Sequence, residues 1–235
     1  GRGTEHGGVA FDASGVGRER LEEAYSAYVK RYRAVGMDIA EQAMEIAPAA
    51  HTSLGGVYAR PDCSTSVEGL FVCGETLGGL HGANRIGGNA GLETMVFGRR
   101  AGCSAAAYMD TLSGEPADCT DEISDAAATV NIDALRAELT KIVGGALGVI
   151  REAGKLEQAK TELERMLEQI PESGCYAQQR LRNDTLTAYA VTLAALERKT
   201  STGCHVRTDS AGEPEKYRVN IRCENGRAVP RRAEI

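Results

Sequence analysis

The sequence predicts an α/β segment followed by an all-α segment that ends in a short β tail. Glycine is concentrated within residues 51–110, around one short apolar run that is typical of a buried strand. From residue 131 onward, apolar residues recur every three or four positions, as on one face of a helix. Residues 217–221 then alternate between apolar and polar side chains, as in a strand.

The first 50 residues predict one strand and one helix. Residues 7–12 begin with two glycines and continue as Val-Ala-Phe-Asp, which is strand-like. Within residues 19–35, apolar and aromatic residues stand at spacings of three and four, which predicts a single helix with one apolar face. That face would consist of Leu21, Tyr25, Tyr28 and Tyr32.

Residues 51–110 predict a strand, a glycine-rich loop and a helix in that order. Residues 67–74 indicate a turn that enters a short, buried strand. Residues 89–109 predict a helix, because four side chains recur on one helical face. They are Leu92, Met95, Val96 and Arg99.

The rest of the chain predicts a linker and a small antiparallel bundle of three helices. Residues 111–130 are rich in Ser, Gly, Pro, Asp and Thr, as linkers are. Asn131 or Asp133 is the expected N-cap of the first helix. The apolar stripes of the three helices are Leu135, Leu139 and Ile142; Leu156, Ala159, Leu163 and Leu167; and Leu181, Leu186, Ala190, Leu193 and Leu196.

Composition disfavours several functional classes. The formal net charge is −6, whereas nucleic-acid binding needs clustered Lys and Arg, so no nucleic-acid partner is expected. No apolar run approaches the roughly 20 residues of a membrane helix, and no secretory signal opens the chain. The seven cysteines include no C-x-x-C pair, so no metal site is predicted. Because the chain begins with Gly1, we expect it to be part of a longer protein.

Residues 74–91 are the segment that carries chemistry. This loop is glycine-rich, which lets a backbone approach a ligand closely, and it leads to a helix start with free N–H groups. Such a place suits a phosphate or the electron-rich pyrimidine edge of a flavin. The segment lacks both the phosphate-loop pattern and the G-x-G-x-x-G dinucleotide pattern.

Three side chains in or beside the glycine-rich segments could bind an acid. Arginine grips a carboxylate through two parallel hydrogen bonds, and histidine can donate another. His51, His81 and Arg85 could therefore hold a small dicarboxylate over a cofactor. On spacing alone, a glycine-rich turn with a structural Arg85 is the simpler interpretation, with His81 as support for the loop.

Four motifs follow one another in residues 51–102: HTSLGGV at 51–57, GLFVCGE at 69–75, HGANRIGGNA at 81–90 and VFGRRAG at 96–102. In this order they resemble the signature run of the fumarate reductase, succinate dehydrogenase and L-aspartate oxidase flavoproteins. The close match covers residues 46–102, and residues 195–209 are similar to the segment that closes the family's helical domain. Thr200 and Thr202 depart from the Glu and Arg that are usual there.

The resemblance implies the C-terminal portion of an FAD-binding flavoprotein fold, with part of its capping domain and part of its FAD domain. The implied divisions are the end of the capping domain at 1–50, the C-terminal segment of the FAD-binding domain at 51–110, the linker at 111–130, the helical domain at 131–206 and a C-terminal tail at 207–235.

The resemblance also implies roles for five residues. His51 and Arg85 would hold the substrate carboxylates. Glu75 would bond the FAD, and Ala90 and Gly91 would offer backbone N–H groups to the flavin pyrimidine edge. The family's proton-carrying arginine would precede Gly1, so no catalytic residue is assigned and the active site is expected to be incomplete.

The implied function is that of a fragment of an FAD-dependent oxidoreductase that interconverts fumarate and succinate by hydride transfer at the flavin. L-aspartate oxidase is the nearest alternative, and a non-catalytic docking module for an iron–sulfur partner is the second. The expected partners are a dicarboxylate substrate, the N-terminal half of the same flavoprotein and an iron–sulfur subunit. The expected location is the cytoplasm. Partner subunits could hold the protein at the cytoplasmic face of a membrane.

Overall fold

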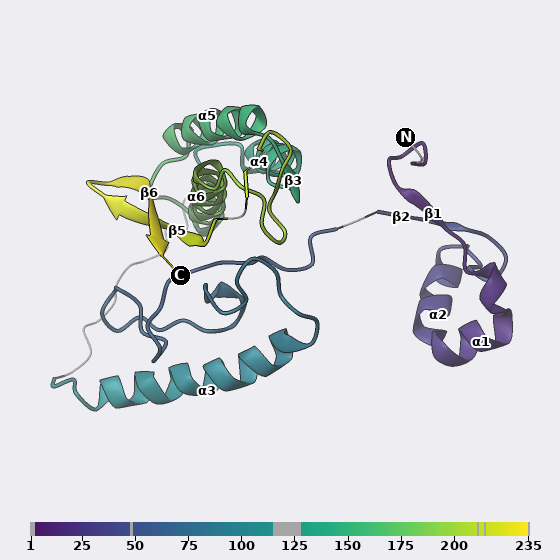
Figure 1. The fold of residues 1–235 in the computed structure, drawn as a ribbon, viewed down its shortest axis with the longest axis horizontal. Helices are drawn as coiled ribbons and strands as arrows, with labels where there is room; N and C mark the ends of the chain where they lie inside the picture. Colours follow the sequence, from purple (N-terminus) through teal and green to yellow (C-terminus); the bar gives the residue numbers. More distant parts are fainter. Residues whose placement is uncertain (1–2, 48, 115–127, 211, 214, 235) are drawn as a thin grey trace. The chain divides into compact units, whose positions relative to one another are not determined.

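The computed structural model describes residues 3–47, 49–114, 128–210, 212–213 and 215–234. These residues belong to two compact units, residues 1–53 and 54–235 (Figure 1). Most of the predicted linker, residues 115–127, lies outside the described residues.

The first unit is a short two-stranded sheet that is closed by two helices. Strand β1 (Val9–Phe11) pairs antiparallel with β2 (Met44–Ile46), which confirms the predicted strand near residues 7–12. A single 3₁₀ turn, η1 (Ser14–Val16), leads into α1 (Arg18–Ala24) and α2 (Ser26–Ala34). The buried apolar cluster consists of Ala13, Leu21, Val29, Ile39 and Met44.

The prediction of a single helix over 19–35 is wrong at its centre. Tyr25 has φ −131° and separates α1 from α2. After this break Val29 is buried and Tyr32 packs partly buried against the cluster, whereas the other two predicted tyrosines do not. Tyr25 and Tyr28 are 54% and 59% exposed. A residue outside helical backbone geometry resets the face that later residues present, and side-chain spacing alone does not reveal it.

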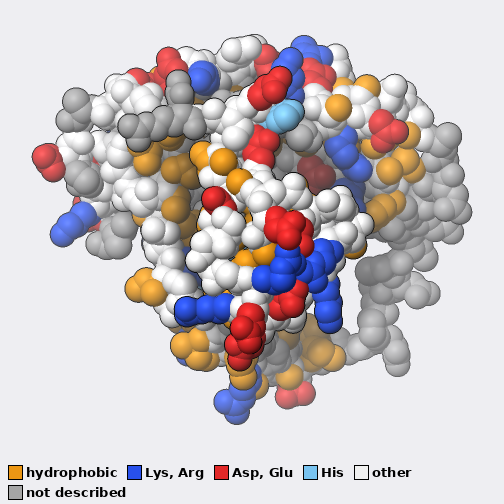
Figure 2. All heavy atoms as spheres, turned by 90° about the vertical axis from the view of Figure 1, so that its right-hand side faces the viewer, with side chains coloured by type: hydrophobic (Ala, Val, Ile, Leu, Met, Phe, Trp, Pro, Cys, Tyr) orange, Lys and Arg blue, Asp and Glu red, His pale blue; other side chains and the backbone are white. Residues whose placement is uncertain are grey.

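Charged side chains pair on the surface of the first unit. Arg18 donates to Asp38 at 2.8 Å, and Arg33 donates to Glu22 at 2.5 Å. The face of the molecule in Figure 2 likewise carries acidic and basic side chains next to one another. Exposed pairs of this kind contribute little stability, so the apolar cluster is the main support of this unit.

The second unit begins with a loop region that packs on one long helix. Helix α3 spans Asn89–Met109, as predicted. The predicted strand over 67–74 is wrong: its only ladder contact among the described residues is an isolated bridge between Ser64 and Phe71. The chain turns back on itself here, so the Val72 N–H donates to the Cys63 carbonyl and the Thr65 N–H donates to the Leu70 carbonyl.

Contacts from the 60–72 loop fix it to α3. The buried Cys63 lies against the Phe97 carbonyl, and Arg100 donates to the Pro61 carbonyl at 3.0 Å. At the far end of α3, the Phe71 and Tyr108 rings meet edge to face, 6.0 Å apart. These contacts hold the start of the glycine-rich segment against the helix into which it leads.

Three helices form the bundle predicted from the apolar stripes. Helix α5 packs against both α4 and α6, as Figure 1 shows. The Asn131 side chain accepts from the Ala134 N–H at 3.1 Å, so Asn131 is the N-cap. The helices are α4 (Ile132–Ala146), α5 (Ala153–Gln169) and α6 (Tyr176–Glu197). Their buried core includes Leu139, Ile142, Ala159, Leu163, Met166, Ile170 and Leu181.

Two further strand pairs complete the unit. The short β3 (Ile150–Arg151) and β4 (Val206–Arg207) pair in parallel. Strands β5 (Tyr217–Glu224) and β6 (Arg227–Glu234) form an antiparallel hairpin that packs on α6, which confirms the predicted β tail. An Asn-Gly turn with positive φ at both residues joins them, as a tight hairpin requires. None of the described helices is both long and apolar enough to cross a bilayer.

Candidate functional site

The two glycine-rich segments meet where their backbones cross. The Val57 N–H donates to the Thr76 carbonyl at 2.8 Å, and the Gly78 N–H donates to the Val57 carbonyl at 3.0 Å. A Cβ at Gly56 would lie only 2.2 Å from the Thr76 oxygen, and one at Gly78 would lie 2.8 Å from the Gly56 oxygen. These two glycines therefore serve the crossing of two backbones, whereas the sequence alone indicated close approach to a ligand.

The glycines next to α3 have open space around them. A Cβ at Gly87, Gly88 or Gly91 would meet no described atom within 4 Å. Gly88 has φ +88° and ends the loop immediately before Asn89. The backbone around the first turn of α3, which includes Ala90 and Gly91, is thus uncrowded at these glycines. A 21-residue helix with such an open N-terminus favours an electron-rich group there.

Arg85 lies in this loop and is half-buried. Its Nε is buried and has no hydrogen-bond partner among the described residues. A buried guanidinium N–H without an acceptor is energetically costly, so an acceptor from a ligand would fit this position.

A histidine–carboxylate pair ties the loop to α3. His81 Nε2 lies 3.4 Å from Glu93 Oε2, and the Glu93 side chain is 7% exposed. This contact agrees with His81 as support for the loop. The second carboxylate oxygen of Glu93, Oε1, is buried without a partner among the described residues. Glu93 was missed in the sequence, because an acid between Leu92 and Thr94 carries no local signal of burial.

The other predicted site residues are spread over both units. Glu75 lies in the 3₁₀ turn η2 (Gly74–Thr76), directly before the crossing at Gly78, and its side chain is exposed. His51 is exposed and belongs to the first unit, whereas Arg85 belongs to the second. The meeting of His51 with Arg85 therefore stays a prediction.

A segment far along the sequence contacts the loop directly before Arg85. The Cys204 N–H donates to the Ala83 carbonyl at 3.0 Å. The Cys204 thiol donates to the Asn84 side-chain oxygen at 3.3 Å. Sequence patterns did not reveal this contact, because it joins residues 120 positions apart.

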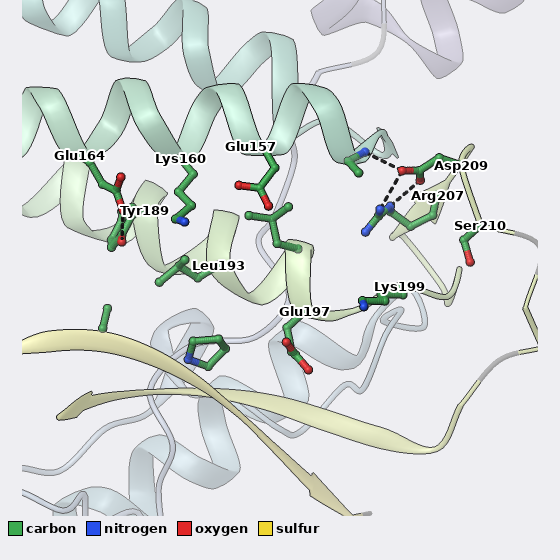
Figure 3. Close-up of a pocket in the computed structure, with 14 residues that line it drawn as sticks. Glu157, Lys160, Glu164, Tyr189, Leu193, Glu197, Lys199, Arg207, Asp209 and Ser210 are labelled. Carbon is green, nitrogen blue, oxygen red and sulfur yellow. Dashed lines mark hydrogen bonds and ion pairs between the residues drawn. The ribbon is translucent and has the colours of Figure 1, made fainter.

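A separate groove of about 890 Å³ lies between α5, α6 and the β5–β6 hairpin (Figure 3). Side chains of both charge signs line it, including Glu157, Lys160 and Lys199. Tyr189 donates to Glu164 at 2.7 Å, and burial, more than this bond, raises the pKa of Tyr189 to about 12. This mixed lining indicates no particular ligand, and the groove does not include the glycine-rich loop.

The chain is similar in sequence to several known flavoproteins. The sequence model of the FAD binding domain family matches residues 1–90, and that of the fumarate reductase flavoprotein C-terminal family matches residues 136–220. One subunit of the fumarate reductase (CoM/CoB) of Methanothermobacter marburgensis is 35% identical over 89% of this chain. An L-aspartate oxidase of Rhodospirillum rubrum is 34% identical, and the match covers 86% of this chain and 71% of that protein.

The chain belongs to the fumarate reductase and L-aspartate oxidase family of flavoproteins. Its fold agrees with this assignment, since Mycobacterium smegmatis Sdh1, solved in complex with UQ1, matches all of this chain with a TM-score of 0.78 and 29% identity. The predicted mixed fold, a part of the FAD-binding and capping domains, is thereby confirmed. The chain spans 41% of the length of the Methanothermobacter protein and 44% of the Sdh1 chain.

FAD is the cofactor of this family, and the described residues fit it in part. The open first turn of α3 could accept the electron-rich edge of a flavin, for the reasons given above. Ala90 and Gly91 would hold that edge through backbone N–H groups, which do not depend on side-chain identity.

Proposed function

We propose that this chain supplies the dicarboxylate-binding part of an FAD-dependent oxidoreductase that interconverts fumarate and succinate. The observation that carries the proposal is Arg85, whose buried Nε lacks an acceptor among the described residues, in a loop that ends at the open start of α3. The relationship to a fumarate reductase from Methanothermobacter supports the choice of substrate.

In this proposal the protein orients the substrate and balances its charge. Arg85 would grip one carboxylate through parallel N–H bonds, and His51 would donate to the other. Bound FAD supplies the hydride chemistry. The grip would hold the carbon–carbon bond at a fixed place and polarise it, which is how positioning accelerates such a step.

Replacement of Arg85 tests this proposal in the complete, FAD-loaded flavoprotein. Loss of a charge-assisted, bidentate contact costs on the order of 3 kcal/mol, so Arg85→Ala should weaken binding of succinate or malonate about 100-fold. The FAD content should stay that of the parent protein, because the flavin contacts assigned to α3 come from the backbone. Arg99→Ala removes an exposed arginine of the same helix region and should leave dicarboxylate affinity unchanged. Unaltered affinity in Arg85→Ala would remove the site assignment.

L-aspartate oxidase is the second candidate activity, and the Rhodospirillum relative favours it. Both substrates carry two carboxylates, so the same grip would serve either. Turnover of the complete flavoprotein with each substrate separates them: L-aspartate oxidation that releases peroxide supports the second candidate, and succinate or fumarate turnover supports the first.

The partners and the location follow from the same proposal. We infer that the N-terminal half of the flavoprotein covers the start of α3, where Leu92 and Met95 are 65% and 77% exposed. An iron–sulfur subunit would exchange electrons with the flavin at the cytoplasmic face of a membrane. If FAD-loaded protein lacks turnover with every dicarboxylate, the non-catalytic docking role becomes the better explanation.

A further inference from the structure

The helical part of the chain makes a close contact with the loop that carries Arg85. Cys204 uses both its backbone N–H and its thiol there, toward the Ala83 carbonyl and the Asn84 side chain. Asn84 directly precedes Arg85. The two contacts therefore hold the backbone two positions before the proposed substrate-binding arginine and the side chain one position before it.

Gly203 makes the approach possible. Its φ is +52°, and a Cβ on it would lie 2.1 Å from the Ala83 oxygen and 2.5 Å from the Ala83 carbonyl carbon. Any other residue would force the two backbones apart. The contact is thus sterically demanding and cannot adapt to a small change in the loop.

The segment that carries Gly203 is itself held rigidly. Thr202 and His205 exchange backbone hydrogen bonds of 2.8 and 2.9 Å, which closes a tight turn around Gly203 and Cys204. The His205 ring bonds the Arg198 carbonyl and the Arg151 guanidinium, each at 2.9 Å. A buried Arg207 bonds the carbonyls at the end of α6, through Ala195 and Arg198. The turn therefore moves with the helical bundle.

We propose that the turn of residues 202–205 is a positioning element for Arg85, so that the helical part of the chain sets the affinity for the dicarboxylate. The inference rests on the proposed role of Arg85 in substrate binding. A guanidinium at the end of a flexible side chain binds both oxygens of a carboxylate more tightly when its backbone is already fixed, because less conformational freedom is lost on binding. A displacement of about 1 Å at such a group can lower activity up to 100-fold.

The test measures malonate affinity in the complete, FAD-loaded flavoprotein. Malonate carries two carboxylates but only one CH₂ group, so it can bind like succinate and cannot be oxidised to an alkene. Gly203→Ala should raise the malonate Kd by at least about tenfold, because the added Cβ displaces the Ala83 carbonyl. Cys204→Ala keeps the backbone bond and should raise it by about threefold. Gly154→Ala and Cys223→Ala are the matched controls, and both should leave the Kd unchanged.

A double-mutant cycle distinguishes positioning from general damage. If the turn acts through Arg85, Gly203→Ala should change the malonate Kd by less than about twofold in an Arg85→Ala background. Additive effects of the two substitutions, or no effect of Gly203→Ala alone, would overturn the inference. If Gly203→Ala does not yield folded flavoprotein, the same cycle with Cys204→Ala decides by the same criteria. The proposed function fails separately, when Arg85→Ala alone leaves the Kd unchanged.

Discussion

At the scale of single residues, His205 shows how burial and hydrogen bonding select one form of a side chain. Its Nε2 faces the Arg198 carbonyl, which can only accept, so Nε2 carries the proton. Its Nδ1 faces the Arg151 guanidinium, which can only donate, so Nδ1 is the acceptor. The ring is therefore neutral in the folded chain. Burial lowers the pKa of His205, and the nearby charges of Arg151, Arg207 and Arg198 lower it further, while the Arg198 carbonyl opposes them.

This assignment predicts the direction of a pH effect on stability. As pH falls through the ordinary value near 6.5, the unfolded chain gains a proton on His205 before the folded chain does. The contribution of His205 is thus complete above that pH and is lost progressively below it. In urea unfolding between pH 7.5 and 5.5, the parent chain should lose more free energy of unfolding than His205→Gln. The difference between the two proteins at pH 7.5 measures the effect of the exchanged hydrogen bonds alone. Equal slopes of unfolding free energy against pH in the two proteins would contradict the assignment.

The turn at Gly203 and the loop at Arg85 show which residues local sequence patterns can predict and which they cannot. The glycine-rich pattern around Arg85 predicted a loop that leads into a helix start, which the structure has, and anion binding there stays a prediction. The residues that hold this loop in place, Gly203 and Cys204, stand some 120 positions away and carry no local pattern. Only the fold brings them to Ala83 and Asn84.

At the scale of elements, the long helices were predictable, whereas a break inside a predicted helix and the absence of one predicted strand were not. Helix α3 and the three bundle helices follow apolar periodicity over many turns, which local sequence determines. The break at Tyr25 depends on the backbone of one residue, so periodicity predicted one helix in place of α1 and α2. The apolar run at 67–74 has the composition of a strand, yet strand formation needs a neighbour to accept its hydrogen bonds.

The bundle core leads to a stability prediction at this scale. Leu163 of α5 is fully buried among residues of α4 and α6, so Leu163→Ala should lower the free energy of unfolding by about 3 kcal/mol. The sequence also places Leu186 of α6 in an apolar stripe, but its side chain is 42% exposed. Leu186→Ala should therefore lower the free energy of unfolding by less than about 1 kcal/mol. Urea unfolding followed by circular dichroism measures both values. A larger loss in Leu186→Ala would show that the core is wrongly assigned.

At the scale of the whole molecule, the proposed function concerns a complete flavoprotein of the family. The chain spans 41% of its Methanothermobacter relative, and the predicted substrate ligands are divided between two units. Arg85 and the start of α3 belong to the second unit, and His51 belongs to the first. The sequence was sufficient for the family, because its signature segments are local, and the roles of the site residues stay predictions. Their arrangement around a bound flavin requires the complete protein.

The most direct measurement is a structure of the complete, FAD-loaded flavoprotein with malonate bound. The account predicts that the Arg85 guanidinium donates to one malonate carboxylate and that His51 lies at the other. It also predicts that the backbone N–H groups of Ala90 and Gly91 face the pyrimidine edge of the flavin. A malonate held by other residues, with Arg85 directed away from the flavin, would contradict it.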